Sequence, residues 1–315
     1  MLLRRSERAD RIALAPAEAV ALPGRRARRV SAKAARMPAR VTVIQPRKGG
    51  FRGALAELWL FRWCVPYFGR LYLRKRYRRT HLGFLWVPLK PSFNIASKIL
   101  VFGGIVGISA GKTPYPIFFL IATASWQLFA EIALWGTRSL EVGRMALQKI
   151  ELPRLPIIFA AIIPGSVEFL VYVGFAAGAL LYYVIRAHAF FLTLGPESVL
   201  VLAGLVLIIF QGVGLGMVLA GSPGRDLRFS LQFGLSFMYF VTPVLYPLSK
   251  VQPQYRPLLE LNPLMGSIEM VKDGLFASHE LTLAASLVAV AGAVALWAIG
   301  LWRLERRRMR VAAAS

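Results

Sequence analysis

A dense cationic cluster is the most distinctive chemical feature of this chain. Five basic residues lie within six positions, immediately before the sequence turns apolar: Arg74, Lys75, Arg76, Arg78 and Arg79. Cationic side chains beside a hydrophobic span are retained on the cytoplasmic face of a membrane, where they also attract anionic phosphate groups. The junction at residues 72–92 therefore predicts the side of the bilayer on which the first span begins.

Two carboxylates, Glu131 and Glu168, lie within or at the margins of long apolar stretches. An ionisable group inside a membrane suggests a functional role because burying it there is costly. Glu131 could pair with Arg138 or another basic neighbour, whereas Glu168 lies deeper in its stretch. A proton relay is the alternative for either carboxylate.

The other reactive residues do not form a catalytic or metal-binding set. Cys64, the only cysteine, is expected to be a partly buried thiol, and three histidines are scattered along the chain. No cluster has the spacing of a catalytic triad or a metal site. Residues 106–113 resemble a phosphate-binding loop, but Val106 stands where that motif requires glycine. We therefore expect no catalytic residue, no metal and no cofactor site in this chain.

The composition is that of an integral membrane protein. The 315 residues are 57% hydrophobic and 17% charged, whereas soluble domains contain roughly 25% charged residues. The net charge of +24 would favour nucleic-acid binding, but 21 of the 39 basic residues lie in residues 1–80. We expect contact with membrane lipids and no binding of nucleic acid.

Hydrophobic stretches of about 20 residues predict an all-α fold with six spanning helices. Their ranges are 85–108, 115–134, 157–185, 199–220, 229–245 and 281–302. With both termini in the cytoplasm, 32 basic residues lie inside and five outside, and Lys90 and Lys98 lie within the first span. This asymmetry follows the positive-inside rule and predicts cytoplasmic termini.

The predicted membrane domain, residues 81–303, has distinct flanking and connecting segments. Residues 1–50 predict a disordered basic tail without a signal peptide, in which Met37 is an alternative start, and residues 304–315 a basic cytoplasmic tail. Residues 51–80 predict a helix lying in the cytoplasmic interface and kinked at Pro66. Residues 137–156 form a cytoplasmic loop, and residues 250–279 predict two short re-entrant helices in the outer leaflet.

An aromatic stripe marks the fifth predicted span. Phe229, Phe233, Phe237 and Phe240 share one helical face, and Tyr239 and Tyr246 lie near its outer half. Such spacing is typical of helix packing. Aromatic faces also stack on sugar rings without fixing their position, so a lining for a sliding polymer is the alternative.

Three segments resemble one known family, the membrane subunits of polysaccharide-exporting ABC transporters. They are RYRRTHLGFLWVPLKP at 76–91, RDLRFSLQFGLSFMYFVTPVLYPLS at 225–249, and LNPLMGSIEMVKDGLF at 261–276. The family shows RY…LG.LW…P, RD…TPV.YP and NP patterns there, commonly with arginine where Lys272 stands. The resemblance extends from about residue 53 to the C-terminus.

This resemblance implies a homodimeric permease in the bacterial cytoplasmic membrane, with two copies of a separate ATP-binding subunit beneath it. ATP and magnesium would bind to that partner, and its hydrolysis cycle would drive export of a lipid-linked O-antigen, capsular or teichoic-type polymer. In the family, the interface helix and the loop after the second span contact the ATPase, which here map to residues 55–79 and 138–154. The first, second and fifth spans would line a conduit between the subunits.

The resemblance and the charge pattern together give three candidate sites. Candidate residues for ATPase coupling are Arg138, Glu141, Arg144, Lys149, Asp226 and Arg228. Candidates for attracting the lipid pyrophosphate are Arg74, Arg76, Arg78 and Arg79. Candidates for lining the conduit are Phe233, Phe237, Tyr239, Phe240 and Tyr246.

Other functions remain open at this point. An exporter of a drug or small lipid with the same fold is the nearest alternative. An ATP-independent channel or scaffold would have no ATPase partner. A membrane-embedded lipid-processing enzyme would need a clustered polar site at one depth, which the sequence does not indicate.

Overall fold

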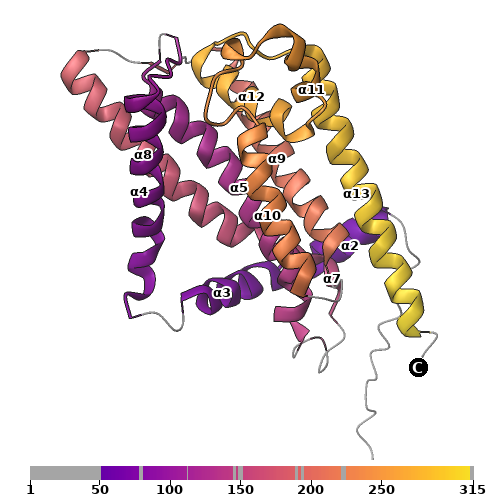
Figure 1. The fold of residues 1–315 in the computed structure, drawn as a ribbon. Coiled ribbons are helices and arrows are strands. Elements are labelled where there is room, and N and C mark those ends of the chain that lie inside the picture. Colours follow the sequence, from indigo (N-terminus) through magenta and orange to yellow (C-terminus); the bar gives the residue numbers. More distant parts are fainter. Residues whose placement is uncertain are drawn as a thin grey trace, which may run out of the picture. The chain divides into compact units, whose positions relative to one another are not determined.

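The chain folds into helices that run between two levels, with short helices lying across each end (Figure 1). The computed structural model describes residues 51–77, 81–111, 113–144, 147, 152–188, 191–192, 195–220 and 225–312. Within these residues the only β structure is an isolated bridge between Ala110 and Thr113. The tail at 1–50 and the arginines at 78 and 79 lie outside the described residues.

The predicted interface helix is two helices, α2 (Phe51–Leu60) and α3 (Cys64–Tyr77). The expected kink at Pro66 is wrong, because the chain instead breaks at residues 61–63. Proline lacks an amide hydrogen and its ring clashes with the carbonyl four residues earlier, so it is tolerated only in the first turn of a helix. Pro66 is the third residue of α3, which places the break just before it.

Opposite faces of α2 and α3 have different environments. Cys64, Phe68 and Tyr72 are buried at four-residue spacing, and α3 packs on α7 (Arg154–Phe159) and α8 (Ile162–Ala187). Trp59 and Trp63, by contrast, are exposed. Exposed tryptophans at helical spacing are typical of a helix at the level of lipid headgroups.

The first predicted span is one helical segment with a change of type. It begins with the 3₁₀ turn η1 (Gly83–Leu85), continues as α4 (Trp86–Lys98), and ends as the π-helix η2 (Ile99–Ile105). Gly103 lies in η2 where an added Cβ would be 2.8 Å from the ring of Tyr115. A π-helical stretch widens the backbone locally, and such stretches often occur at functional sites.

Helix α5 (Tyr115–Val142) is the central helix of the fold. It packs on α8 and on α9 (Ser198–Leu219), and most of its residues are buried. Small residues allow the close approach, because Gly136 of α5 and Gly216 of α9 face each other at the crossing. Without a hydrophobic driving force between helices in lipid, such close packing is a main source of their association.

The C-terminal part of the chain packs mainly on α9 and, through α10, on α5. Its elements are α10 (Arg225–Val241), η3 (Leu248–Lys250), η4 (Pro253–Tyr255), α11 (Arg256–Glu260), α12 (Pro263–Phe276) and α13 (Leu283–Ala312). Helices α12 and α13 both pack on α9, whereas α10 packs on α5. The short helices α11 and α12 lie at the end opposite α3 (Figure 1).

Four helical segments are long and apolar enough to cross a membrane: Tyr115–Val142, Arg154–Arg186, Ser198–Leu219 and Leu283–Arg306. These coincide with four of the six predicted spans. Helix α10 has a shorter apolar part, Phe229–Val241, and the first predicted span is divided between α4 and η2. The all-helical class is confirmed, and the count of six spans stays a prediction.

The crossing of α5 and α9 gives a stability prediction. A Cβ built on Gly136 would lie 2.9 Å from the Cα of Gly216, so Gly136→Val must push the helices apart. We expect a loss of about 1–3 kcal/mol from overpacking. Thermal unfolding of purified protein would measure it, with Gly174→Val as the control because an added Cβ there meets nothing within 4 Å. Equal melting temperatures for the two variants would contradict this packing.

Candidate functional site

One arginine of α3 binds two carboxylates of the helix bundle. Nη1 of Arg76 is 2.7 Å from Oε2 of Glu131, and its Nη2 is 3.2 Å from Oε1 of Glu131 and 3.2 Å from Oε2 of Glu168. All three side chains are at most 17% exposed. The planar guanidinium suits this arrangement because it donates several hydrogen bonds in fixed directions. Glu131 therefore pairs with Arg76. Its contacts within the described residues do not include the predicted pairing with Arg138.

Tyr72 and Trp135 support this ion cluster. The indole Nε1 of Trp135 donates to Oε2 of Glu131 at 3.1 Å, and the ring of Trp135 stacks on Tyr72 with centroids 5.4 Å apart. The hydroxyl of Tyr72 donates to the carbonyl of Ile157 at 2.8 Å. Burial raises the pKa of Tyr72 well above its ordinary value, so the hydroxyl stays protonated and remains a donor. Helix α3 is thus fixed to both α5 and α7.

The buried thiol of Cys64 lies on the same face of α3. Burial raises its pKa, which keeps it in the less reactive protonated form. In the described part of the chain, no group of three or more His, Cys, Asp or Glu side chains is placed to hold a metal ion.

A stripe along α5 continues from the Arg76 cluster through the helix. Residues at four-residue intervals are neighbours along a helix, and over several turns they form a stripe that winds slowly around it: Tyr115, Phe119, Thr123, Gln127, Glu131 and Trp135. Gln127 donates to the hydroxyl of Tyr172 on α8 at 3.2 Å, and the hydroxyls of Thr123 and Tyr239 are 3.2 Å apart. The hydroxyl of Tyr115 donates to the carbonyl of Leu245 at 2.9 Å. The polar groups of Tyr115, Thr123, Gln127 and Glu131 therefore tie α5 to other segments.

Sequence reasoning noticed Glu131 but missed the rest of this stripe. Its signal was present, because polar and aromatic residues recur every four positions in an otherwise apolar helix. Lys98 was likewise left without a role, although its amine lies 3.9 Å from the centroid of the Tyr239 ring. A cation over an aromatic face is stabilised by the ring quadrupole. This contact joins α4 to α10.

The structure separates the predicted conduit residues into two groups. Phe229, Phe233, Phe237 and Phe240 are between 56% and 76% exposed, and they share one face of α10. Tyr239 is instead buried against Trp126 and Thr123 of α5. Tyr246 folds back, and its hydroxyl donates to the carbonyl of Val241 at 3.2 Å. Only the phenylalanines present an open aromatic surface.

Most predicted coupling residues lie at the end of the fold that carries α3. Arg138 and Glu141 belong to the last turns of α5, so the predicted loop at 137–156 begins later than expected. Nζ of Lys75 is 3.5 Å from the carbonyl of Val142, and an added Cβ on Gly143 would be 3.4 Å from the ring of Phe68. The two segments predicted to meet an ATPase thus touch each other.

The remaining coupling candidates are less fully described. Arg144 is exposed, Asp226 is exposed in the first turn of α10, and Lys149 lies outside the described residues. Arg228 belongs to α10, but its side chain is not described. A carboxylate in the first turn of a helix interacts favourably with the helix dipole, which gives Asp226 a structural role as well.

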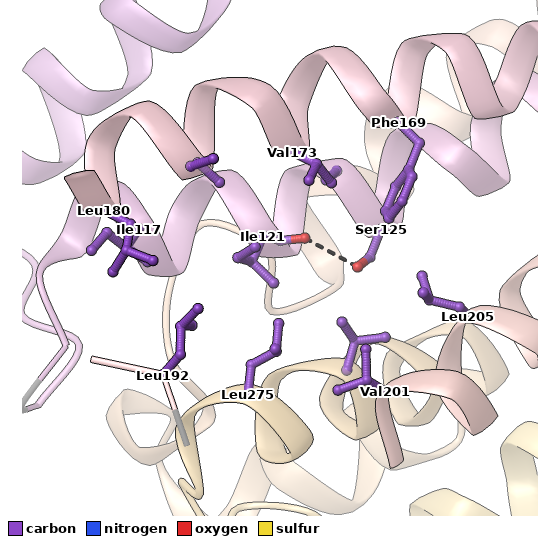
Figure 2. Close-up of a pocket in the computed structure, with 14 residues that line it drawn as sticks. Ile117, Ile121, Ser125, Phe169, Val173, Leu180, Leu192, Val201, Leu205 and Leu275 are labelled. Carbon is purple, nitrogen blue, oxygen red and sulfur yellow. Dashed lines mark hydrogen bonds between the residues drawn. The ribbon is translucent and has the colours of Figure 1, made fainter. Parts of the chain in front are cut away.

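An apolar cavity of about 290 Å³ lies between α5, α8, α9 and α12 (Figure 2). Aliphatic side chains such as Ile121, Val173 and Leu205 form most of its wall. The hydroxyl of Ser125 is the polar exception, and it donates to the carbonyl of Ile121 at 3.0 Å.

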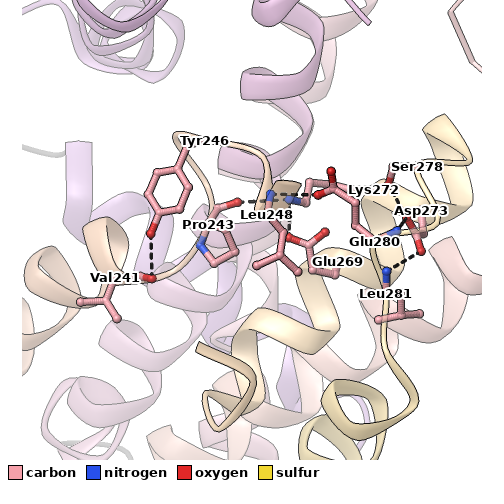
Figure 3. Close-up of polar contacts among 10 residues, drawn as sticks. All are labelled: Val241, Pro243, Tyr246, Leu248, Glu269, Lys272, Asp273, Ser278, Glu280 and Leu281. Carbon is pink, nitrogen blue, oxygen red and sulfur yellow. Dashed lines mark hydrogen bonds and ion pairs between the residues drawn. The ribbon is translucent and has the colours of Figure 1, made fainter. Parts of the chain in front are cut away.

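Helix α12 carries a buried polar cluster at the opposite end from α3 (Figure 3). Lys272 forms an ion pair with Glu269, donates to the carbonyl of Pro243 at 3.2 Å, and lies 4.8 Å from the centroid of the Phe118 ring. Asp273 accepts hydrogen bonds from the amides of Glu280 at 3.2 Å and Leu281 at 2.9 Å. The cluster fixes α12 to the segments before and after it.

Two of the three family-like segments meet at this cluster. Nδ2 of Asn262 donates to Oγ1 of Thr242 at 2.9 Å, and Oδ1 of Asn262 accepts from the amide of Leu264, capping α12. Together with the contact between Lys272 and Pro243, this joins the TPV sequence to the NP sequence. These residues therefore form a structural junction that sequence spacing alone did not predict.

Comparison with known proteins bears on the function of this architecture. None of the protein-family profiles compared with the chain matches it. The chain is 28% identical over 253 residues to the O-antigen export system permease protein RfbA of Myxococcus xanthus, covering 77% of this chain and 92% of that protein. It is 23% identical over 207 residues to the polysialic acid transport protein KpsM of Escherichia coli, covering 66% and 79%. It is also 23% identical over 201 residues to RfbA of Klebsiella pneumoniae, covering 64% and 75%.

These relatives confirm the family resemblance drawn from the three sequence segments. Two of the three are permease proteins of O-antigen export systems, and the third is a polysaccharide transport protein. The chain is thus a homologue of permease subunits of polysaccharide exporters, at modest identity over most of its length.

Proposed function

We propose that this chain is the membrane subunit of an ABC exporter that moves a lipid-linked polysaccharide across the bacterial cytoplasmic membrane. It would act as a homodimer with two copies of a separate ATP-binding subunit. The observation that carries this proposal is the similarity to O-antigen export permeases over most of the chain. The apolar spanning helices and the exposed aromatic face of α10 support it.

In this proposal the subunit has six spans and both termini are cytoplasmic. The spans would be α4 with η2, α5, α7 with α8, α9, α10 with the residues after it, and α13. Helices α11 and α12 would be re-entrant in the outer leaflet. The exposed tryptophans Trp59, in α2, and Trp63, in the break before α3, support a position at the cytoplasmic surface.

Coupling to ATP hydrolysis would pass through α3. The end of α5 and the middle of α3 contact each other, so a partner bound at Arg144 or Glu141 would press on both. Because Arg76 binds carboxylates on α5 and α8, a displacement of α3 would be transmitted to these helices. Rigid helices joined by ion pairs are a physical route for such coupling.

The lipid pyrophosphate would meet the arginines at the end of α3. Arg74 is exposed, whereas Arg76 is engaged by Glu131 and Glu168. We therefore assign attraction of the phosphate to Arg74, Arg78 and Arg79, and assign to Arg76 the anchoring of α3. The exposed phenylalanines of α10 would then stack on the passing sugar rings.

The alternative of a drug or small-lipid exporter is not favoured, because the relatives named above act on polysaccharides. The open aromatic face of α10 also suits a polymer, since stacking holds sugar rings without fixing their position. A scaffold or ATP-independent channel would bind no ATPase.

Co-purification and ATPase measurements test the proposed function. We expect the chain to co-purify with an ATP-binding subunit, and lipid-linked glycans to stimulate ATP hydrolysis of the reconstituted complex. Arg144→Glu should weaken both, because it reverses an exposed charge at the proposed contact. Lys250→Glu, an exposed change at the opposite end, is the matched control. Stimulation by small lipids alone, or a chain that binds no ATPase, would contradict the proposal.

A further inference from the structure

The apolar cavity of Figure 2 is a slot between two neighbouring helices. Helices α8 and α9 follow each other in sequence and both pack on α5, but they make little contact with each other. Helix α12 packs on α9 and supplies Val271 and Leu275 to the wall. Ala177 lines the slot and is exposed, so the slot opens between α8 and α9 toward the surroundings of the bundle.

The wall of the slot accepts only hydrocarbon. Its one hydroxyl, on Ser125, already donates to the carbonyl of Ile121. A water molecule needs two to four polar partners to occupy a cavity, and an apolar cavity of this kind stays dry. An empty slot would leave its lining side chains without dispersion contacts on one side. A flexible aliphatic chain needs no polar partner, and it would restore the dispersion contacts of the lining side chains.

The position of the slot indicates that this aliphatic chain belongs to a lipid of the bilayer. Both helices at its mouth are long and apolar enough to cross a membrane, so the mouth faces the lipid bilayer. The slot runs along the middle of α8, from Phe169 to Leu180, and along the first half of α9, at Val201 and Leu205. This is the half of the fold that holds α12, away from α3 and its arginines (Figure 1).

Arg186 marks the level of the lipid headgroups on α8, but it lies on the face of the helix opposite Ala177, because nine residues make about 2.5 helical turns. Arg186 is exposed in the last turn of α8, six residues beyond Leu180. At 1.5 Å per residue this is about 9 Å farther along the helix axis, toward the end of the span. Arginine at the end of a spanning helix reaches the headgroup region.

We propose that this slot binds one acyl chain of a membrane phospholipid from the leaflet on the α12 side. The lipid fills the gap between α8 and α9 and so completes the packing around α5. This site is separate from the transported substrate, whose lipid would enter on the opposite side. Failure of this inference therefore leaves the proposed export function unaffected.

Photolabelling tests the assignment. The full-length protein is placed in vesicles that contain a phospholipid with a diazirine at the end of one acyl chain, and labelled peptides are mapped by mass spectrometry. We expect label to concentrate on the slot side chains of α5, α8 and α9. Ala177→Phe should reduce that label several-fold, because the larger ring blocks the mouth.

Controls make each outcome decisive. Ala291→Phe places the same ring on an exposed position of α13 and should leave slot labelling unchanged. Ala176→Phe is a second blocking variant in case Ala177→Phe folds poorly. Label spread evenly over exposed side chains, or unchanged in both blocking variants, would overturn the proposal. Loss of label on adding a polyprenyl phosphate would assign the slot to that chain instead, and would also overturn it.

Discussion

Lys272→Met is expected to destabilise the protein by about 3–5 kcal/mol, because removing one partner of a buried ion pair leaves the other charge uncompensated. The side chain of Glu269 is 0% exposed and that of Lys272 is 2% exposed. Among the residues that the structure describes, Glu269 has no polar partner for its carboxylate besides the ammonium of Lys272, so this ion pair is its principal compensation. The variant also loses the hydrogen bond to Pro243, which holds the chain after α10.

Thermal unfolding of the purified protein in detergent measures this loss. Lys272→Arg should retain most of the stability, because arginine keeps the charge and can reach the same carbonyl. The double variant Lys272→Met with Glu269→Leu should recover much of it, since an apolar pair can replace a buried ion pair. Lys250→Met removes an exposed lysine from the same end and is the control. A melting temperature for Lys272→Met equal to that of this control would contradict the role of the pair.

This buried lysine illustrates what sequence patterns predict and what they do not. Charge counting placed Lys272 on the outer side of the membrane, within residues 250–279, which were predicted to form two short re-entrant helices. The structure buries its side chain in α12, where a glutamate three residues earlier and a carbonyl from a distant segment satisfy it. The contact with Pro243, 29 residues away, is part of no local sequence pattern, so the burial of Lys272 could not be predicted from its own segment.

The spanning helices were easier to predict from the sequence than the side-chain contacts between them. Long apolar runs determine a spanning helix by themselves, because every backbone group is satisfied within the segment. This is why α5, α8, α9 and α13 coincide with predicted spans. The direction in which Tyr239 faces was not predictable, because the aromatic stripe of α10 and the buried tyrosine lie on adjacent positions of one helix. Contacts with Thr123 and Lys98 decide it.

The candidate residues were proposed from the sequence, but their contacts were not: carboxylates hold Arg76, and Tyr239 and Tyr246 do not share the open face of the phenylalanines. The cationic cluster, the two membrane carboxylates and the end of α5 were all identified from residue type and position. Their pairing was not, because Glu131 and Glu168 lie 37 residues apart on different helices and 55 or more residues from Arg76. The structure brings all three together, and this makes Arg76 an anchor in our proposal.

Arg76→Gln is therefore expected to abolish most polymer export. The free energy that holds α3 against the bundle should fall by about 2–3 kcal/mol. This is less than the full cost of breaking a buried ion pair, because the cluster is slightly exposed. Glutamine cannot bridge both carboxylates, so Glu131 and Glu168 would repel each other while α3 loses its contact with α5 and α8. Polymer at the cell surface is the measurement, with membrane insertion checked in parallel.

Two comparisons separate anchoring from simple attraction of phosphate. Arg74→Gln removes an exposed arginine of the same helix and should reduce export only modestly, because one cation of a cluster contributes little by itself. The triple variant Arg76→Gln, Glu131→Gln and Glu168→Gln removes the repulsion as well as the anchor, so stability should recover while export stays low. Full export in that triple variant would show that the ion cluster serves folding alone. Equal loss in Arg74→Gln and Arg76→Gln would instead return Arg76 to the phosphate-binding group, because a residue held by two carboxylates should not behave like an exposed one.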